Sequence, residues 1–258
     1  MSDILSKVRK LNWMLQESPT GAFSFNEMCE ILSDLLDANV YVTNTRGKVI
    51  GVSLKIKQDS STIKDAETGD ESFPGEYNEG LMKVKKTCAN MSGEEALTIF
   101  KYDYDTSDKL HTVIPIVGGG NRWGTLIVTR YEPEFTDEDL VLGECGATIV
   151  GLEIQRIKTE EEEEEAREVA VVQMAIDTLS YSEVEAVKCI FAELEGTEGS
   201  LVASKIADRS GITRSVIVNA LRKLESAGVI ESRSLGMKGT RIKILNDNLK
   251  SELARIDM

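Results

Sequence analysis

The side chains best suited to a chemical task are cations and small hydrogen-bonding groups between residues 203 and 240. Lysine and arginine neutralise phosphate, and arginine, asparagine and serine can also bond the edges of bases. Five such side chains lie on the polar side of one amphipathic segment: Arg214, Ser215, Asn219, Arg222 and Lys223. The nucleic-acid interface that they predict is completed by Ala203, Ser204, Lys205, Thr213, Ser234 and Lys238.

A helix-turn-helix must position these side chains, and the sequence carries its signals. Ala207 and Gly211 have the spacing at which a small residue lets two helices approach and a glycine makes the turn between them. Thr213 is placed to cap a second helix that runs to about Ala227. The apolar face of this helix is predicted to comprise Val216, Ile217, Ala220, Leu221 and Leu224.

After Gly228 the sequence alternates as a β-hairpin does. Residues 229–233 and 241–244 are predicted strands around a loop with two glycines and Lys238, which gives a winged helix-turn-helix domain over residues 179–258. Residues 197–246 carry nine Lys and Arg against four Asp and Glu, a charge of +5 on a chain of −14. A basic module on an acidic body is expected where one part alone meets a polyanion. The alternative is a winged helix that binds protein.

Signals for catalysis and metal binding are weak. His111 is the single histidine and begins an apolar strand, so packing explains it better than acid–base catalysis. Gly75 and Gly80 have the spacing of phosphate-loop glycines, but leucine and methionine follow where lysine and a hydroxyl are needed. The four cysteines are far apart, which fits a reducing compartment better than disulfides or zinc. We therefore predict no enzyme, metal or cofactor, and a cytoplasmic protein without a membrane span or a signal peptide.

The N-terminal half is predicted to form an α/β sensory domain of the GAF or PAS kind over residues 1–136. Helices are expected from Ile4 to Leu15 and after a capping box at Ser24 and Glu27. The second helix is expected to bury Phe25, Met28, Ile31, Leu32 and Leu35. The predicted strands are 39–43, 48–52, 97–102, 112–117 and 123–130, with loops and a short helix over 57–71 and a turn over 103–108.

A long helix is predicted to link the two domains over residues 137–178. Thr136 is a suitable N-cap, and the acidic residues that follow it favour the positive end of the helix dipole. The six consecutive glutamates of 160–165 also allow a disordered tail, but apolar periodicity resumes at Val169. A continuous helix with a solvated acidic stretch explains both features better. A further helix is expected from Tyr181 to Leu194.

Three stretches resemble the CodY family of global transcription regulators of low-GC Gram-positive bacteria: residues 203–240, the AVVQMAI string of 170–176 and the IVGGGNRWGTLI hairpin of 116–127. The resemblance covers nearly the whole chain and is looser between residues 55 and 110. It implies a homodimer whose GAF domain binds branched-chain amino acids, mainly isoleucine but also leucine and valine, and which responds to GTP. The loaded dimer is implied to bind AT-rich palindromic operator DNA.

The resemblance also implies site residues. The family's Phe-Pro-x-x-Tyr motif is intact from Phe73 to Tyr77, and the amino-acid pocket is then expected at Thr62, Ile63, Ala66, Phe73, Pro74, Tyr77, Thr98 and Phe100. The family's arginine and methionines in the segment matching residues 60–67 are absent here, which leaves backbone amides to hold the ligand's carboxylate. Thr45 replaces one of two paired arginines, and GTP contacts are implied at Phe25, Asn44, Arg46, Lys48, Glu153 and Lys158.

The favoured hypothesis is a dimeric transcriptional repressor gated by an amino acid. Ligand is expected to close the sensory domain and, through the long helix, to set the spacing of two recognition helices to the operator half-sites. The alternative is a nucleotide-gated sensor or scaffold whose winged helix contacts protein. The salt dependence of binding to an AT-rich palindrome separates the two, because phosphate neutralisation makes DNA binding fall steeply with salt.

Overall fold

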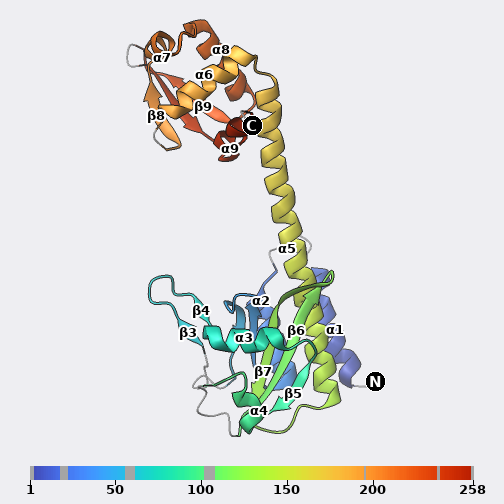
Figure 1. Ribbon diagram of the computed structural model, residues 1–258. Helices are drawn as coiled ribbons and strands as arrows, with labels where there is room; N and C mark the ends of the chain where they lie inside the picture. The colour runs from blue at the N-terminus through green and yellow to red at the C-terminus, as the bar shows by residue number, and fades with distance from the viewer. Residues whose placement is uncertain are drawn as a thin grey trace. The chain divides into compact units, whose positions relative to one another are not determined.

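The computed structural model describes residues 3–17 (side chains to 14), 23–55, 62–101, 108–194, 196–236 and 239–256. The chain divides after Lys158 into two compact units, residues 1–158 and 159–258. One helix, α5 (Asp137–Asp177), runs through this division (Figure 1). The predicted continuous helix is therefore confirmed, and the alternative of a disordered acidic tail is wrong: α5 spans residues 137–177, where 137–178 was expected.

The first unit is built on a five-stranded antiparallel sheet in the order β2-β1-β7-β6-β5. Its elements are α1 (Asp3–Glu17), α2 (Phe25–Leu36), β1 (Asn39–Asn44), β2 (Val49–Ser53), α3 (Gly75–Lys83), β5 (Cys88–Met91), α4 (Gly93–Leu97), β6 (Leu110–Gly118) and β7 (Asn121–Arg130). A separate hairpin is formed by β3 (Ile63–Lys64) and β4 (Glu71–Ser72). In Figure 1, α1, α2 and the start of α5 cover one face of the sheet, and α3 and α4 cover the other.

The sheet separates two apolar cores because successive side chains of a strand point to opposite faces. Val42 faces a core to which α1, α2 and α5 contribute buried leucines. Tyr41, one residue earlier, faces a second core built with side chains of α3 and α4. The register aligns Tyr41 with Ile127 of β7 and Val42 with Leu126, so the division continues across the strands. Both faces of the sheet are therefore buried.

Two sequence predictions in the loop-rich part of this unit are wrong. Residues 97–101 form the end of α4 and a turn rather than a strand, because Ala96, Ile99 and Phe100 have helical spacing and bury together. The fifth strand of the sheet is β5 instead, and Tyr102 lies outside the described residues. From Thr62 to Glu71 the chain makes the β3–β4 hairpin and no helix, while the predicted turn at 103–108 lies outside the described residues except at Asp108.

The caps at Ser24 and Thr136 and the central β6–β7 hairpin are confirmed. The Ser24 hydroxyl accepts the Glu27 N–H (3.2 Å) at the start of α2. Thr136 and Asp139 cap α5 reciprocally, with backbone N–H to side-chain oxygen distances of 3.3 and 3.0 Å.

The buried face of α2 is rotated from the prediction: Phe25, Ile31 and Leu35 are only partly buried, whereas Met28, Leu32, Cys29, Ser33 and Leu36 are buried.

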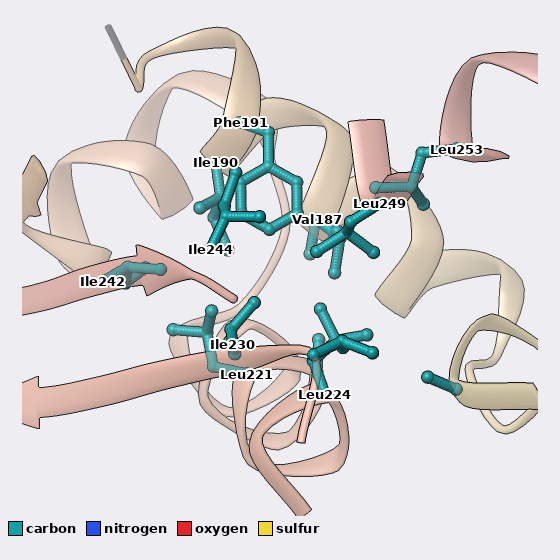
Figure 2. Close-up of a cluster of buried hydrophobic side chains, with 14 of the residues drawn as sticks. Val187, Ile190, Phe191, Leu221, Leu224, Ile230, Ile242, Ile244, Leu249 and Leu253 are labelled. Carbon is teal, nitrogen blue, oxygen red and sulfur yellow. The ribbon is translucent and has the colours of Figure 1, made fainter. Parts of the chain in front are cut away.

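The second unit is a winged helix-turn-helix. After the end of α5 come α6 (Tyr181–Ala192), β8 (Glu198–Leu201), α7 (Ala203–Ser210), α8 (Arg214–Ser226), β9 (Ile230–Ser234), β10 (Thr240–Ile244) and α9 (Asn248–Arg255). The sheet order is β8-β10-β9, so the predicted hairpin gains a third strand. Figure 2 shows the core that unites these elements, with Phe191 of α6, Leu224 of α8 and Leu253 of α9 converging.

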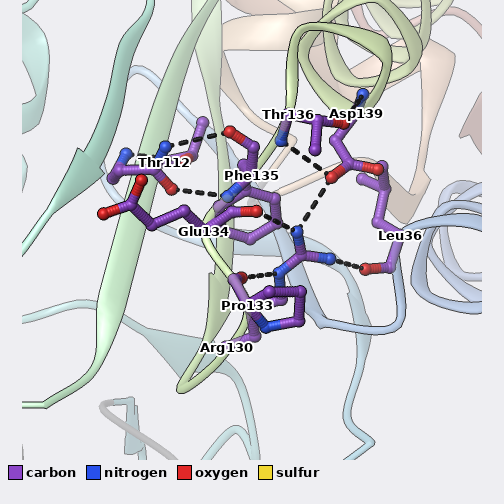
Figure 3. A network of polar contacts seen from close by, with 9 residues as sticks. Leu36, Thr112, Arg130, Pro133, Glu134, Phe135, Thr136 and Asp139 are labelled. Carbon is purple, nitrogen blue, oxygen red and sulfur yellow. Dashed lines mark hydrogen bonds and ion pairs between the residues drawn. The ribbon is translucent and has the colours of Figure 1, made fainter.

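Arg130, at the end of β7, is nearly buried and ties the first unit together (Figure 3). Its guanidinium donates to the carbonyl oxygens of Leu36 (2.6 Å), Pro133 (2.6 Å) and Glu134 (2.9 Å) and pairs with the Asp139 carboxylate at 2.8 Å. The guanidinium carbon also lies 4.0 Å from the centre of the Phe135 ring. One side chain thus joins the end of α2, the β7–α5 loop and the first turn of α5.

Replacing this guanidinium is expected to destabilise the first unit strongly. Arg130→Met keeps much of the side-chain volume but leaves buried carbonyls and the Asp139 carboxylate without their donor, at a cost of about 3–5 kcal/mol in the free energy of unfolding. Both tryptophans, Trp13 and Trp123, belong to this unit, so urea unfolding followed by their fluorescence reports on it.

Lys55→Met is the matched control, because Lys55 forms an exposed pair with Asp34 at 2.7 Å. Exposed ion pairs contribute little to stability, so this variant is expected to unfold almost as the wild type does. Equal unfolding midpoints for the Arg130 and Lys55 variants would show that the Arg130 network does not hold the fold.

Candidate nucleic-acid interface and effector site

The turn before the recognition helix is set by Gly211. Its N–H donates to the Ala207 carbonyl (3.0 Å) at the end of α7, and its φ of 70° is one that glycine adopts without strain. Thr213 occupies the N-cap position of α8, as predicted, but its hydroxyl does not accept a backbone N–H. It is hydrogen-bonded to the Ser215 hydroxyl instead (3.0 Å), while the Thr213 carbonyl accepts the first helical bonds.

The two faces of α8 differ in burial. Ile217, Ala220, Leu221 and Leu224 are buried in the core, and Val216 is partly buried. The opposite face exposes a row of predicted contact residues: Arg214, Ser215, Asn219 and Arg222. Neither arginine forms an ion pair with any residue that the structure describes, so both guanidinium groups are available to phosphate or base edges.

Lys223 follows Arg222 directly but is engaged within the unit. Its ammonium donates to the Glu183 carboxylate of α6 (2.7 Å) and to the Thr178 carbonyl (2.8 Å). The predicted role of Lys223 as a DNA contact is therefore not supported by its position. The sequence indicates that Lys223 is charged, but it does not indicate that Glu183, 40 residues earlier in the chain, is its partner.

The remaining predicted contacts flank α8. Ser204 and Lys205 are exposed in the first turn of α7, Ala203 beside them is partly buried, and Ser234 is exposed at the end of β9. Lys238 in the wing lies outside the described residues. The structure adds cations that the sequence did not single out as contacts. A hollow of about 190 Å³ on the wing sheet is lined by Arg233, Arg241 and Lys243 and by two acids, Glu231 and Glu198, the latter paired with Arg241 at 2.7 Å.

In the first unit, three predicted pocket residues come together. Phe73, Tyr77 and Phe100 belong to one buried cluster, each at most 4% exposed. The Tyr77 and Phe100 rings meet edge to face with centroids 5.8 Å apart. His111 stacks on Phe100 at 4.4 Å, which places the single histidine in packing, as the sequence indicated. The three rings form an aromatic wall on the inner face of the sheet, which is the face that α3 and α4 cover.

The other predicted pocket residues are not buried with this wall. Ile63 is 57% exposed, and Ala66 and Thr98 are also exposed. Pro74 is partly buried as the residue before α3, and the Thr62 hydroxyl, also partly buried, donates to the Glu71 carboxylate. The β3–β4 hairpin explains the exposure of Ile63 and Ala66, because it stands outside the main sheet.

Polar residues that sequence reasoning missed are buried on the same face of the sheet. Thr43 and Thr125 are fully buried and Thr129 is 3% exposed. Arg122 reaches the Thr125 hydroxyl (2.9 Å) and the Val84 carbonyl (2.7 Å), and burial lowers the pKa of its guanidinium. The signal in the sequence was the alternation of threonine with Leu126 and Val128 along β7.

The residues implied for GTP lie in part at one end of this sheet. The Asn44 side chain accepts the N–H groups of Arg46 (2.9 Å) and Lys48 (3.1 Å), which shapes the β1–β2 turn. Asn44 is aligned with Gly124, next to Trp123, over whose ring the Lys158 ammonium lies at 4.8 Å. The other implied residues make contacts of their own: Lys48 with Asp70, Glu153 with Arg156, and Phe25 with Phe23.

A sensory α/β unit joined through one helix to a winged helix-turn-helix defines a transcription regulator that carries its sensor and its DNA reader in one chain. A family model described as the CodY GAF-like domain matches residues 3–178, and one described as the CodY helix-turn-helix domain matches residues 197–256. The chain belongs to the CodY family. The predicted family and fold class are therefore confirmed.

Similar proteins agree with this assignment over the full length. A global transcriptional regulator CodY of Brevibacillus brevis is 56% identical over 256 residues, covering 98% of each chain. One of Clostridium perfringens is 54% identical over 258 residues, covering 99% of this chain and 100% of the relative. A solved structure of the cofactor-binding GAF domain of the nutrient sensor CodY from Clostridium difficile is 44% identical, with a TM-score of 0.50, and covers 60% of this chain and 99% of its own.

The chain is thus a global transcriptional regulator with a sensory GAF domain and a DNA-binding domain, and it is not an enzyme. The two domains imply DNA and a small molecule as partners. Within the described ranges, no three His, Cys, Asp or Glu side chains are grouped to hold a metal ion. Among the same residues, no helix is long and apolar enough to span a membrane.

The helix-turn-helix geometry is expected to depend on the backbone of Gly211. Gly211→Ala places a Cβ in open space but forces an L residue into the left-handed region, at a cost of about 1–2 kcal/mol. Gly211→Asn tolerates that region better and serves as the control. Hydrogen exchange measured on peptides of α7 and α8 is expected to be faster for the alanine variant than for asparagine. Equal exchange in both variants would contradict the assigned turn.

Proposed function

We propose that the chain is a homodimeric repressor that acts in the cytoplasm on AT-rich palindromic operators. Branched-chain amino acids, chiefly isoleucine, and GTP raise its affinity for the operator. The observation that carries the proposal is the exposed row Arg214, Ser215, Asn219 and Arg222 on a helix whose other face is buried. A helix of this kind presents its outer side chains to base edges in a major groove.

Charge supports DNA as the partner. The +5 of residues 197–246 contrasts with the −14 of the whole chain, so phosphate attraction is confined to the winged helix. A second copy follows from the palindrome, because each recognition helix reads one half-site and half-sites lie about one helical turn apart. The wing, with Lys238 and the cations of β9 and β10, supplies phosphate contacts that position the helix.

The aromatic wall of the first unit supports an apolar effector. An isoleucine side chain against Phe73, Tyr77 and Phe100 gains about 0.8 kcal/mol for each methylene fully buried. Valine, one methylene smaller, is then discriminated by a few-fold to about a hundredfold. The ligand's carboxylate and ammonium need polar partners, which backbone amides and the threonines of the inner sheet face can supply.

GTP is assigned to the end of the sheet where Asn44, Arg46 and Lys158 lie. The cations Arg46 and Lys158 suit phosphates, which form their strongest hydrogen bonds with charged donors. Effector binding shifts the population of a state whose recognition helices fit the operator, and α5 carries the change because both units share it. Isothermal titration with isoleucine and GTP, separately and together, tests both assignments.

Arg214→Ala and Arg222→Ala are expected to abolish specific operator binding and to leave isoleucine binding intact. Each removes a guanidinium that faces outward from α8, so only non-specific binding should remain, with a slope of log affinity against log salt that is flatter by about one for each phosphate no longer neutralised. Fluorescence anisotropy with an AT-rich palindromic duplex across a salt series measures both effects. Loss of isoleucine binding in either variant would show that the two functions are not separated.

Lys238→Ala tests the wing in the same assay. It is expected to weaken specific and non-specific DNA alike, with a slope flatter by about one. An unchanged slope would place the wing outside the interface.

Phe73→Ala is expected to weaken isoleucine binding and to remove isoleucine-stimulated operator binding, while the basal operator affinity survives. The physical reason is the cavity left in the aromatic wall, where Phe73 meets Tyr41 edge to face at 5.4 Å. Val141→Ala, at an exposed position of α5 in the same unit, is the control for a general effect of truncation. A Phe73 variant with wild-type sensitivity to isoleucine would place the effector site elsewhere.

A further inference from the structure

Two adjacent basic residues of the recognition helix have opposite surroundings. Arg222 is exposed and forms no ion pair in the described part of the chain. The Lys223 ammonium contacts two fixed oxygens, the Glu183 Oε2 at 2.7 Å and the Thr178 carbonyl at 2.8 Å. Neighbouring side chains on a helix point about 100° apart, which lets one face outward while the next turns to the body of the unit.

The partners of Lys223 are themselves held in place. Glu183 belongs to a capping box, in which the same Oε2 accepts the Ser180 N–H at 2.7 Å and the Ser180 hydroxyl accepts the Glu183 N–H at 3.4 Å. Its side chain is only 9% exposed. The Lys223 ammonium, followed by the Ser180 N–H, lowers the pKa of the Glu183 carboxyl. Thr178 directly follows α5, so three elements meet at one ammonium group.

Apolar packing is incomplete on this side of the recognition helix. A groove of about 560 Å³ lies between the end of α5 and α8, and it is lined by Val171, Met174, Ala175, Thr178, Arg222, Lys223, Ser226 and Ala227. Met174 is 70% exposed along it. Side chains that line an open groove do not interdigitate, and apolar contacts lack direction. The directed bonds from Lys223 therefore act together with the shared apolar core in holding α8 against the end of α5.

We propose that Lys223 is a positioning residue for DNA recognition rather than a DNA contact. Together with Glu183 and the Thr178 carbonyl it forms a clasp, the Lys223 clasp, that holds α8 to the end of α5. The inference rests on the proposed operator binding by α8. Opening the clasp loosens the packing of α8 against the end of α5, and the small displacement that its core contacts still allow moves the guanidinium groups of Arg214 and Arg222 from the positions that the operator requires.

Glu183→Gln separates this role from phosphate contact. Glutamine still suits the capping box but carries no negative charge, so the ion pair is lost and Lys223 is held more weakly. If Lys223 bound phosphate, its release would leave operator binding unchanged or tighter. The clasp instead requires Glu183→Gln and Lys223→Met each to weaken binding, by several-fold to about tenfold, with the salt slope of the wild type. The double variant should bind the operator as well as the single variant with the lower affinity does, because both substitutions open the same clasp.

The experiment uses the full chain, an AT-rich palindromic duplex and saturating isoleucine, over a salt series. Arg222→Met is the control at the neighbouring position and is expected to flatten the salt slope by about one. Lys223→Arg, which keeps the positive charge, should retain more operator affinity than Lys223→Met. Hydrogen exchange is a second readout: peptides covering residues 178–183 and α8 should exchange faster in Lys223→Met and Glu183→Gln than in Arg222→Met.

Either of two results would overturn the clasp alone. The first is a flatter salt slope for Lys223→Met together with unchanged or tighter operator binding by Glu183→Gln. The second is wild-type operator affinity and wild-type hydrogen exchange in both variants. A wild type whose binding to the duplex does not fall with salt would overturn the proposed operator binding, and with it the positioning role. The failures of the two proposals are thus distinguishable.

Discussion

A single helix contributes to a hydrophobic core in each of the two units, and the rest of the architecture depends on that constraint. Near its start, α5 contributes Leu142 and Val150 to the core under the sensory sheet. Near its end, it contributes Val172 and Ile176 to the core of the winged helix. Apolar burial therefore fixes both ends of the helix, while its middle is solvated. Each unit needs its own end of α5 to complete its core.

Packing and polar chemistry have separate tasks in each unit. In the winged helix, buried residues such as Ile217 and Leu224 set the inward face of α8, and the outward face is left to arginine, serine and asparagine. In the sensory unit, Arg130 satisfies backbone carbonyls at the edge of one core, while aromatic rings fill the other. In the winged helix, the exposed polar groups thus lie on a face whose backbone is set by residues that are buried beneath it.

Much of the fold could be predicted because its signals are local. A cap such as Thr136, the glycines of the β6–β7 turn and the apolar periodicity of α8 each act within a few residues. The strand predicted at residues 97–102 failed because Ile99 and Phe100 suit a buried turn as well as a strand. Strand β8 was missed because four residues that include Gly199 carry little strand signal, and its pairing with β10 comes from tertiary structure.

The candidate site was predictable only where side-chain type was sufficient. Exposed Arg214 and buried Phe73 followed from helical periodicity and from a family motif. The contacts that a charged side chain makes could not be predicted, because the sequence does not show which residue it will pair with. Lys223, which pairs with Glu183, is the example. Nor could the surface position of Ile63, which depends on the β3–β4 hairpin, be predicted from an apolar residue in a loop-rich segment.

The acidic stretch of α5 has a consequence for how the molecule responds to ionic strength. Residues 160–165 are all glutamate, and Arg167 pairs with Glu163 (3.3 Å) and Glu164 (2.9 Å). Like charges three and four residues apart destabilise a helix, and salt screens that repulsion. Added salt therefore stiffens this part of α5, whereas it weakens the attraction of α8 for phosphate. One solution variable thus acts in opposite directions on the helix that links the two units and on the attraction of the recognition helix for phosphate.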